Sequence, residues 1–337
     1  MDDRAGPQGV VPRGRVLRIA VAVAVTGGLT ALIAFAVPYG EVADAFGALD
    51  ARWLVPMLAA YALTFPSRAA RFRSLGVPLS LPALTGVSAI HQFMNRLLPL
   101  RTGEFAFPML VRRLCGKSLV EGLALVALCL LLDLSVVVVA FLAALLAVPQ
   151  AREAIGPVGT VLIAAALPAL LAGYLLLPGL GSRLARRLGK RLAPRHPRAA
   201  ERLAQAADTL EAVRTLSRRG FLGAVVWTVI QWVALFATFW ATLAAMGIDL
   251  GPAEVVAGST AAIIAAAVPI GGIGSFGTLE AGWAAGFVLV GVPRGPAVAS
   301  ALVASGASFV FVLLLAGISW AVLRRRRSPT PGGSSSG

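Results

Sequence analysis

The sequence is poor in the residue types on which most enzymes depend. Only 13% of its 337 residues are charged, and it contains two cysteines and two histidines. Cys115 and Cys129 cannot build a disulfide framework, and neither lies in a metal-ligand spacing. With His91 and His196 alone, no Ser/His/Asp or Cys/His arrangement can be assembled, so hydrolytic catalysis is not expected. We therefore predict a protein that is not an enzyme and that needs neither a metal nor a cofactor.

Acidic residues are also scarce, with 15 Asp and Glu against 30 Lys and Arg, which gives a net charge of +15. A charge of this size can indicate nucleic-acid binding. Here, however, the arginines cluster at the ends of apolar segments, and no polar stretch is long enough to form a soluble domain with a basic face. The pattern is typical of cytoplasmic loops that attract anionic lipid. We expect anionic lipid, and no nucleic acid, at the basic loops.

Long apolar runs dominate what remains, because 58% of the residues are hydrophobic. Several runs reach the ~20 residues that are needed to cross the hydrocarbon core of a bilayer. The sequence therefore predicts an all-α, polytopic helical membrane protein. The full spans are expected at about 16–37, 52–70, 118–147, 157–178, 220–246 and 296–323.

The positions of the basic residues predict the orientation in the membrane. Arginines precede the first span, and Arg324–Arg327 follow the last one. Because cytoplasmic loops carry an excess of Lys and Arg, both termini and the basic loop 182–202 are predicted to be cytoplasmic, in a multi-pass protein of the cell (inner) membrane. The arginines that close the second span are assigned to the same cytoplasmic edge: Arg68, Arg71 and Arg73.

Two apolar segments are interrupted by proline and glycine. The pieces 81–98 and 103–114 flank a first break, and the pieces 253–268 and 278–291 flank a second. Irregular backbone at membrane depth is tolerated only inside protein or against water. We interpret both segments as re-entrant helical hairpins that enter from opposite sides and form an inverted repeat; two unrelated kinks are the alternative. The residues that make the breaks are Pro99, Gly103, Pro269, Gly271, Gly272 and Gly274.

This interpretation divides the chain into three parts. Residues 1–15 form a cytoplasmic N-terminal segment, and residues 324–337 form a basic stop with a flexible Gly/Ser tail. Residues 16–323 form a single transmembrane domain. Its first half is 16–178, a basic cytoplasmic loop and helix occupy 179–219, and its second half is 220–323.

Charged residues beside the first break are the main candidates for a site. Ionisable groups at membrane depth are expensive and usually mark function. Glu104 begins a half-helix, where the helix dipole favours a carboxylate, and Arg101 can pair with it. Arg96 is then available for a phosphate, whose oxygens suit the guanidinium fork. A purely structural salt-bridge network is the alternative. Asn95 and His91 lie on the same half-helix, where we expect them to line the cavity.

Two further acidic residues lie within apolar segments. Asp133 is near the middle of its span, so it should face the bundle interior and pair with Arg96 or Arg101. Protonation of Asp133, and with it a role in proton coupling, is the alternative. Glu280 follows the second break in the position that Glu104 occupies after the first.

The motif around the first break resembles a known family. The pattern Asn95-x-x-Leu98-Pro99-x-Arg101-x-Gly103-Glu104, followed by Gly116-Lys117-Ser118 and by Asp133, is similar to the lysylphosphatidylglycerol synthase transmembrane-region family of flippase-like proteins. The resemblance covers roughly residues 50–323 and implies movement of an anionic or glycosylated lipid between leaflets. This chain has Phe107-Pro108 and Leu130 where family members commonly carry arginines, which implies a less cationic site or a different headgroup.

The expected function is a translocase that moves an anionic phospholipid, a polyprenyl phosphate or a glycolipid through a polar cavity at the midplane. Arg96 and Arg101 would hold a phosphate-containing headgroup, while Glu104, Asp133 and Glu280 would balance charge or take up a proton. The alternative is a membrane subunit or scaffold of a lipid-linked glycosyltransferase or another lipid-modifying enzyme. In that case the partner enzyme would be recruited through the basic loop 182–202.

Overall fold

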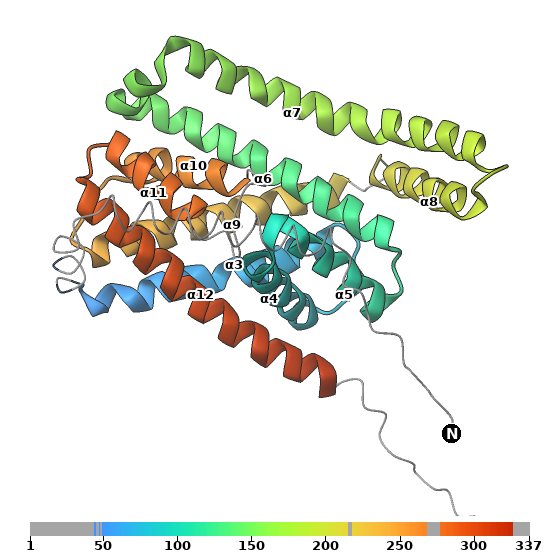
Figure 1. Cartoon of the computed structure of the whole chain (residues 1–337), viewed down its shortest axis with the longest axis horizontal. Coiled ribbons are helices and arrows are strands. Elements are labelled where there is room, and N and C mark those ends of the chain that lie inside the picture. Colours follow the sequence, from blue (N-terminus) through green and yellow to red (C-terminus); the bar gives the residue numbers. More distant parts are fainter. Residues whose placement is uncertain (1–43, 45–46, 48, 215–217, 268–276, 326–337) are drawn as a thin grey trace, which may run out of the picture.

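The computed structural model describes residues 44, 47, 49–214, 218–267 and 277–325 (Figure 1). Every regular element in these ranges is a helix, so the all-α prediction is confirmed. The first expected span, 16–37, lies outside the described residues. So do the second break, with Pro269, Gly271, Gly272 and Gly274, and most of the tail at 324–337.

The described helices follow the expected order closely. They are η1 (Ala51–Trp53), α3 (Leu54–Ser74), α4 (Leu81–Leu97), η2 (Pro99–Phe105), α5 (Ala106–Cys115), α6 (Leu119–Ala147), α7 (Pro149–Leu192), α8 (Pro197–Arg214), α9 (Arg218–Ala245), α10 (Pro252–Ala267), α11 (Thr278–Leu289) and α12 (Arg294–Arg325).

Four described helices are long and apolar enough to cross a membrane, and they match four of the expected spans. The matching stretches are Leu119–Ala147, Pro149–Leu170, Arg218–Ala245 and Arg294–Arg324. The helix at the expected span 52–70, α3, is not among them, because the three arginines in its C-terminal third lower its mean hydropathy. It packs against α9 and α4.

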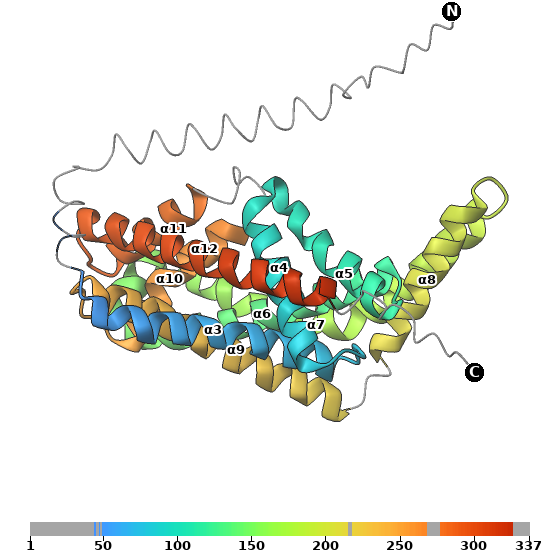
Figure 2. The ribbon, with the colours of Figure 1, turned by 90° about the horizontal axis from the view of Figure 1, so that it is seen from below.

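The basic loop expected at 182–202 is instead mostly helical. After a kink at Gly156, α7 continues without a break to Leu192, and α8 begins at Pro197 and folds back along it. Arg, Lys and Leu are good helix formers, so this segment has no local reason to be a loop. Gly189 of α7 lies against Ala200 and Leu203 of α8. The resulting α7–α8 arm projects beyond the other helices (Figure 2).

The helix contacts have the symmetry of an inverted repeat. α3 packs on α9, α4 packs on α12, and α6 packs on α10. If α3, α4, α5 and α6 are exchanged in order with α9, α10, α11 and α12, the same set of helix contacts results. The backbone N–H of Asp50, before α3, donates to the carbonyl of Ala245 at the end of α9 at 2.8 Å, and Ser74 lies against Gly223 at the other end. α3 and α9 are therefore antiparallel, as repeats of opposite orientation require.

The first break is a tight 3₁₀ turn that folds α5 back against α4. Gly103 in η2 lies so close to α4 that a Cβ atom there would overlap the backbone of Asn95. Glycine is therefore required at this position, because only a residue without a side chain permits the approach. The turn and the two helices form one hairpin, α4–η2–α5, which matches the first hairpin expected from the sequence.

The second hairpin, α10–α11, is held by an equally close backbone contact. A Cβ atom at Gly286 would overlap the carbonyl oxygen of Gly258 and would lie 2.8 Å from the Cβ of Ala261. We expect Gly286→Ala to lower the free energy of unfolding by about 1–3 kcal/mol, as overpacking does. Thermal unfolding in detergent measures the effect. Gly306→Ala in α12 is the matched control, since no atom lies within 4 Å of a Cβ there. Equal unfolding temperatures for the two variants would contradict the prediction.

Candidate functional site

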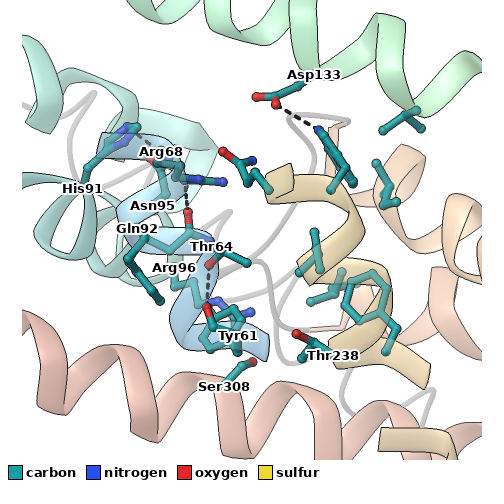
Figure 3. A pocket seen from close by; sticks show the side chains of 18 of the residues that line it. Tyr61, Thr64, Arg68, His91, Gln92, Asn95, Arg96, Asp133, Thr238 and Ser308 are labelled. Carbon is teal, nitrogen blue, oxygen red and sulfur yellow. Dashed lines mark hydrogen bonds between the residues drawn. The ribbon is translucent and has the colours of Figure 1, made fainter. Parts of the chain in front are cut away.

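A cavity of about 470 Å³ lies at the centre of the bundle, between helices of both halves (Figure 3). Its walls come mainly from α3, α4 and α6 of the first half and from α9, α11 and α12 of the second. The polar side chains that line it are those of Tyr61, Thr64, Arg68, Arg71, His91, Gln92, Asn95, Arg96, Glu104, Asp133, Gln231, Thr238, Glu280, Ser305 and Ser308.

The wall formed by α3 is a polar stripe at helical spacing. Tyr61, Thr64, Arg68 and Arg71 are three or four residues apart, so they share one face of the helix. The sequence interpretation placed both arginines at the cytoplasmic end of the second span, and the structure adds that they line the cavity. Of the three arginines in α3, only Arg73, which does not belong to this stripe, is exposed to solvent. The polar residues spaced three or four positions apart from Tyr61 onward could have shown from the sequence that Arg68 and Arg71 belong to one polar helix face.

Asp133 forms a buried ion pair with Arg71. The Nη1 of Arg71 donates to Oδ1 of Asp133 at 2.6 Å, and the Arg71 side chain is 3% exposed. The same oxygen accepts a hydrogen bond from the indole Nε1 of Trp232 at 2.9 Å. Arg71, and not the expected Arg96, is therefore the partner of Asp133, while the other expected partner, Arg101, has its side chain outside the described side chains. The helix of Asp133, α6, faces the α3–α9 pair, which brings Arg71 and Trp232 within reach.

Glu104, at the first break, lies beside His91 of α4. Oε2 of Glu104 and Nε2 of His91 are 3.1 Å apart, and Nδ2 of Asn95 is 3.3 Å from the same ring nitrogen. The predicted partner of Glu104 was Arg101. The side chain of Arg101, like that of Pro99, lies outside the described side chains. The structure places Glu104, near the end of the break, against the polar side chains of the C-terminal half of α4.

Glu280 lines the cavity but already has a structural partner. It is 3% exposed, and its Oε2 accepts a hydrogen bond from the backbone N–H of Gly277 at 2.7 Å. A carboxylate in this position caps the first turn of α11 and interacts favourably with the helix dipole. Its geometry is therefore that of a cap beside the cavity.

Arg68 and Arg96 differ from Arg71 in having neutral partners. Nη1 of Arg68 donates to Oε1 of Gln92 at 2.6 Å, and Nη1 of Arg96 reaches the carbonyl of Ser305 at 3.4 Å. Within the described ranges, neither guanidinium forms an ion pair. Figure 3 shows both side chains extending into the space beside Tyr61 and Asn95. Two positive charges with neutral partners make this part of the cavity a candidate anion site.

Several buried polar atoms on the walls have no hydrogen-bond partner in the described part of the chain. They are Oη of Tyr61, Nε of Arg71, Oδ1 of Asn95 and Oε1 of Gln231. Buried polar atoms in folded proteins nearly always have a partner, so these atoms point to a polar occupant. The same ranges contain no group of three or more His, Cys, Asp or Glu side chains that could hold a metal ion.

Six of the seven residues that the sequence singled out line this cavity: His91, Asn95, Arg96, Glu104, Asp133 and Glu280. Sequence reasoning did not identify Arg68, Arg71, Gln231 and Trp232 as site residues. Gln231 lies within the apolar helix α9 and is 2% exposed. A single amide side chain in the middle of a membrane span could have indicated a site residue. Burying such a group in an apolar environment costs free energy unless it faces a polar space.

Comparison with protein families gives one match, which covers most of the chain. Residues 16–316 match the family described as the lysylphosphatidylglycerol synthase TM region. The matched range includes every residue that lines the cavity. A search among curated proteins finds no match.

Proposed function

Because the chain belongs to the lysylphosphatidylglycerol synthase TM region family, and is thus a multi-pass membrane protein, we propose that it is a lipid translocase. It moves an anionic phospholipid, a polyprenyl phosphate or a glycolipid between the two leaflets. The observation that carries this proposal is the pair Arg68 and Arg96, which face a central cavity and whose hydrogen-bond partners in the described part of the chain are neutral.

A lipid phosphate fits this pair chemically. A guanidinium group donates two parallel hydrogen bonds to a phosphate, and such charge-assisted bonds are about twice as strong as neutral ones. Both arginines are half-buried, so the cavity wall screens their charge less than bulk water would. The phosphate takes the place of Gln92 and of the Ser305 carbonyl as the partner of the two side chains.

The position of the pair suits alternating access. Arg68 and Arg96 belong to the first half of the chain, whereas Ser305 on α12 belongs to the second. Secondary transporters bind their substrate between inverted repeats and expose it by rocking one repeat against the other. Such a movement changes the distance between Arg96 and Ser305. The headgroup crosses inside the cavity while the acyl chains stay in lipid.

Transfer of labelled lipid in proteoliposomes tests the proposal. Vesicles that contain the purified protein should expose fluorescent phosphatidylglycerol from the inner leaflet to a membrane-impermeant reducing agent. Protein-free vesicles, prepared in the same way, give the background rate. The proposal fails if phosphatidylglycerol, a polyprenyl phosphate and an anionic glycolipid all move at that background rate.

The α7–α8 arm favours a second candidate function, that of a scaffold. Leu184 and Leu188 are 58% and 39% exposed on the arm, and the exposed Arg187 and Arg191 flank them. An apolar stripe bordered by arginines suits the anionic surface of a membrane or the acidic face of a lipid-modifying enzyme. If the protein is a scaffold only, Arg187→Glu with Arg191→Glu removes the partner enzyme's activity, and the transfer assay stays at background throughout.

We also infer that the protein lies in the cell membrane, in the orientation that the distribution of arginines predicts. Both termini and the α7–α8 arm are cytoplasmic, and the α9–α10 turn at Asp249 is outside. With Cys115 and Cys129 replaced by Ser, an impermeant maleimide added to intact cells should label Asp249→Cys and should not label Lys190→Cys. Both positions are exposed, so accessibility does not limit the comparison. Labelling of position 190 in intact cells would overturn the assignment.

A further inference from the structure

The α7–α8 arm has a row of exposed leucines along α7. A leucine recurs at every fourth residue, and each side chain is at least 36% exposed: Leu176, Leu180, Leu184, Leu188 and Leu192. Residues four apart lie on neighbouring turns of a helix, so these side chains form one continuous leucine ridge. Single exposed leucines are ordinary on a protein surface, whereas a contiguous apolar patch usually marks an interaction site.

The end of the leucine ridge lies beyond the reach of the bilayer. From Pro157, after the kink, to Leu192, α7 is one helix, which at 1.5 Å per residue is about 54 Å long. The hydrocarbon core is ~30 Å thick, and each headgroup layer adds about 5–7 Å. At the average tilt of about 20°, a helix that enters the core at Pro157 leaves the headgroups near residue 183. The leucines from Leu184 onward are therefore in water.

The neighbouring helix α6 supports this placement. It packs beside α7 and contains 29 residues, Leu119–Ala147, whereas α7 continues to Leu192. Because the two helices are joined by a tight turn and run antiparallel, the last turns of α7 extend past the start of α6 (Figure 1). Apolar side chains that stand in water on a projecting helix are covered by protein rather than by lipid.

Arginines border the leucine ridge on the side away from α8. Each of the last three leucines directly follows an exposed arginine: Arg183, Arg187 and Arg191. One residue turns a helix by about 100°, so the arginines form a parallel row beside the ridge. Gly189, which follows a leucine and lies against α8, marks the other side. The segment 183–195 contains no Asp or Glu, so this surface has a strongly positive edge.

From this geometry, and resting on the scaffold candidate of the proposed function, we infer that the arm docks an acidic amphipathic helix of a partner protein. The apolar face of that helix covers the leucine ridge, and its Asp or Glu side chains pair with the arginine row. An anionic membrane offers the same charges, but it does not reach the end of the arm. A second copy of the same face has the same positive charge and is therefore repelled.

A depth measurement decides whether lipid or protein covers the ridge. With Cys115 and Cys129 replaced by Ser, a nitroxide label is attached to Leu188→Cys in nanodiscs of phosphatidylglycerol and phosphatidylcholine. We expect a water-soluble nickel complex to reach this label. The same complex should not reach a label at Leu162→Cys, which is exposed on the apolar span of α7. If oxygen but not nickel reaches position 188, the arm lies on the bilayer and the inference is overturned.

A synthetic peptide tests the docking itself. The probe is a fluorescein-labelled amphipathic helix with leucines on one face and glutamates on the other. Fluorescence anisotropy measures its binding to the full-length chain in phosphatidylcholine nanodiscs, and empty nanodiscs give the background. We expect a dissociation constant in the micromolar range and about tenfold weaker binding of the same peptide with lysines in place of the glutamates. Equal binding of both peptides, or binding of neither, overturns the inference.

Variants on the two rows locate the binding surface. Leu184→Gln with Leu188→Gln should weaken binding of the acidic peptide about tenfold, because the apolar contact is lost. Arg187→Gln should weaken it less and should reduce its dependence on salt. Arg113→Gln on α5 changes the net charge equally and should bind the peptide as the parent does. Parental affinity in the double leucine variant, at the parental unfolding temperature, contradicts the inference.

These results are separable from lipid transfer. The residues that line the cavity do not include any from the arm, so peptide binding does not depend on translocation. Selective peptide binding by a chain that moves no lipid supports the inference and favours the scaffold over the translocase. Transfer of lipid by a chain that does not distinguish the two peptides refutes the inference and leaves the translocase standing.

Discussion

Arg71→Met lowers the free energy of unfolding by about 3–5 kcal/mol, because it leaves Asp133 without its charge partner inside the bundle. The Arg71 side chain is 3% exposed and that of Asp133 is 16% exposed, so water cannot replace the lost interaction freely. The hydrogen bond from Trp232 remains, but one neutral donor does not compensate a buried carboxylate. Chemical or thermal unfolding in detergent measures the loss.

The reverse change and the double variant make this result specific. Asp133→Leu alone should also destabilise the protein, since it leaves Arg71 buried and unpaired. Arg71→Met combined with Asp133→Leu removes both charges, and we expect it to recover most of the stability, as replacing a complete buried pair often does. Arg73→Met on the exposed end of the same helix is the control and should change little. If the losses from the two single variants simply add, the pair does not carry the stability of this region.

Arg96→Gln should lower the transfer of phosphatidylglycerol by about 10- to 100-fold while leaving the fold intact, because it removes one charge-assisted bond to the phosphate. The fold tolerates the change because the partner of Arg96 is a neutral carbonyl at 3.4 Å, and no carboxylate is left behind. The rate of fluorescent lipid exposure in vesicles, together with the unfolding temperature of the same sample, separates the two effects.

Matched arginine variants show whether charge or geometry matters. Arg96→Lys keeps the charge but loses the planar fork, so its transfer rate should lie between those of Arg96→Gln and the parent. Arg113→Gln, exposed at the end of α5, changes the net charge by the same amount and should transfer lipid at the parental rate. A stable Arg96→Gln protein with the parental rate would rule out phosphate binding by this residue.

Local features of the chain were predictable because local chemistry controls them. The break at Pro99–Gly103 follows from the fixed φ of proline and from a glycine that permits close approach. The capping box of Ser118 and Glu121 begins α6 within a residue of the expected start of its span. Apolar length alone predicted the four confirmed spans. These features need no knowledge of which helix lies beside which.

The partners within the cavity were not predictable in the same way. Arg71 and Asp133 are 62 positions apart, and nothing in the periodicity of either helix points to the other. The rule that arginines mark the membrane edge assigned Arg68 and Arg71 to the cytoplasmic end of their span, and it did not indicate that both face an internal cavity. Gln231 carries no charge, so a search for ionisable groups passed over it. Three-dimensional packing, which pairs α3 with α9, supplied all of this information.

The glycine contact between α10 and α11 has a mechanical consequence. The carbonyl of Gly258 lies against Gly286 with no side chain between them, so the two helices are in direct backbone contact. Such close packing is expected to resist sliding of one helix past the other. The α10–α11 hairpin should therefore move as a rigid body, with bending confined to its ends. At one end, Gly291 holds a positive φ of 96° in the short turn before α12. The acyl chains, which stay in lipid while the headgroup crosses, are then expected to follow an interface between helices other than the α10–α11 contact.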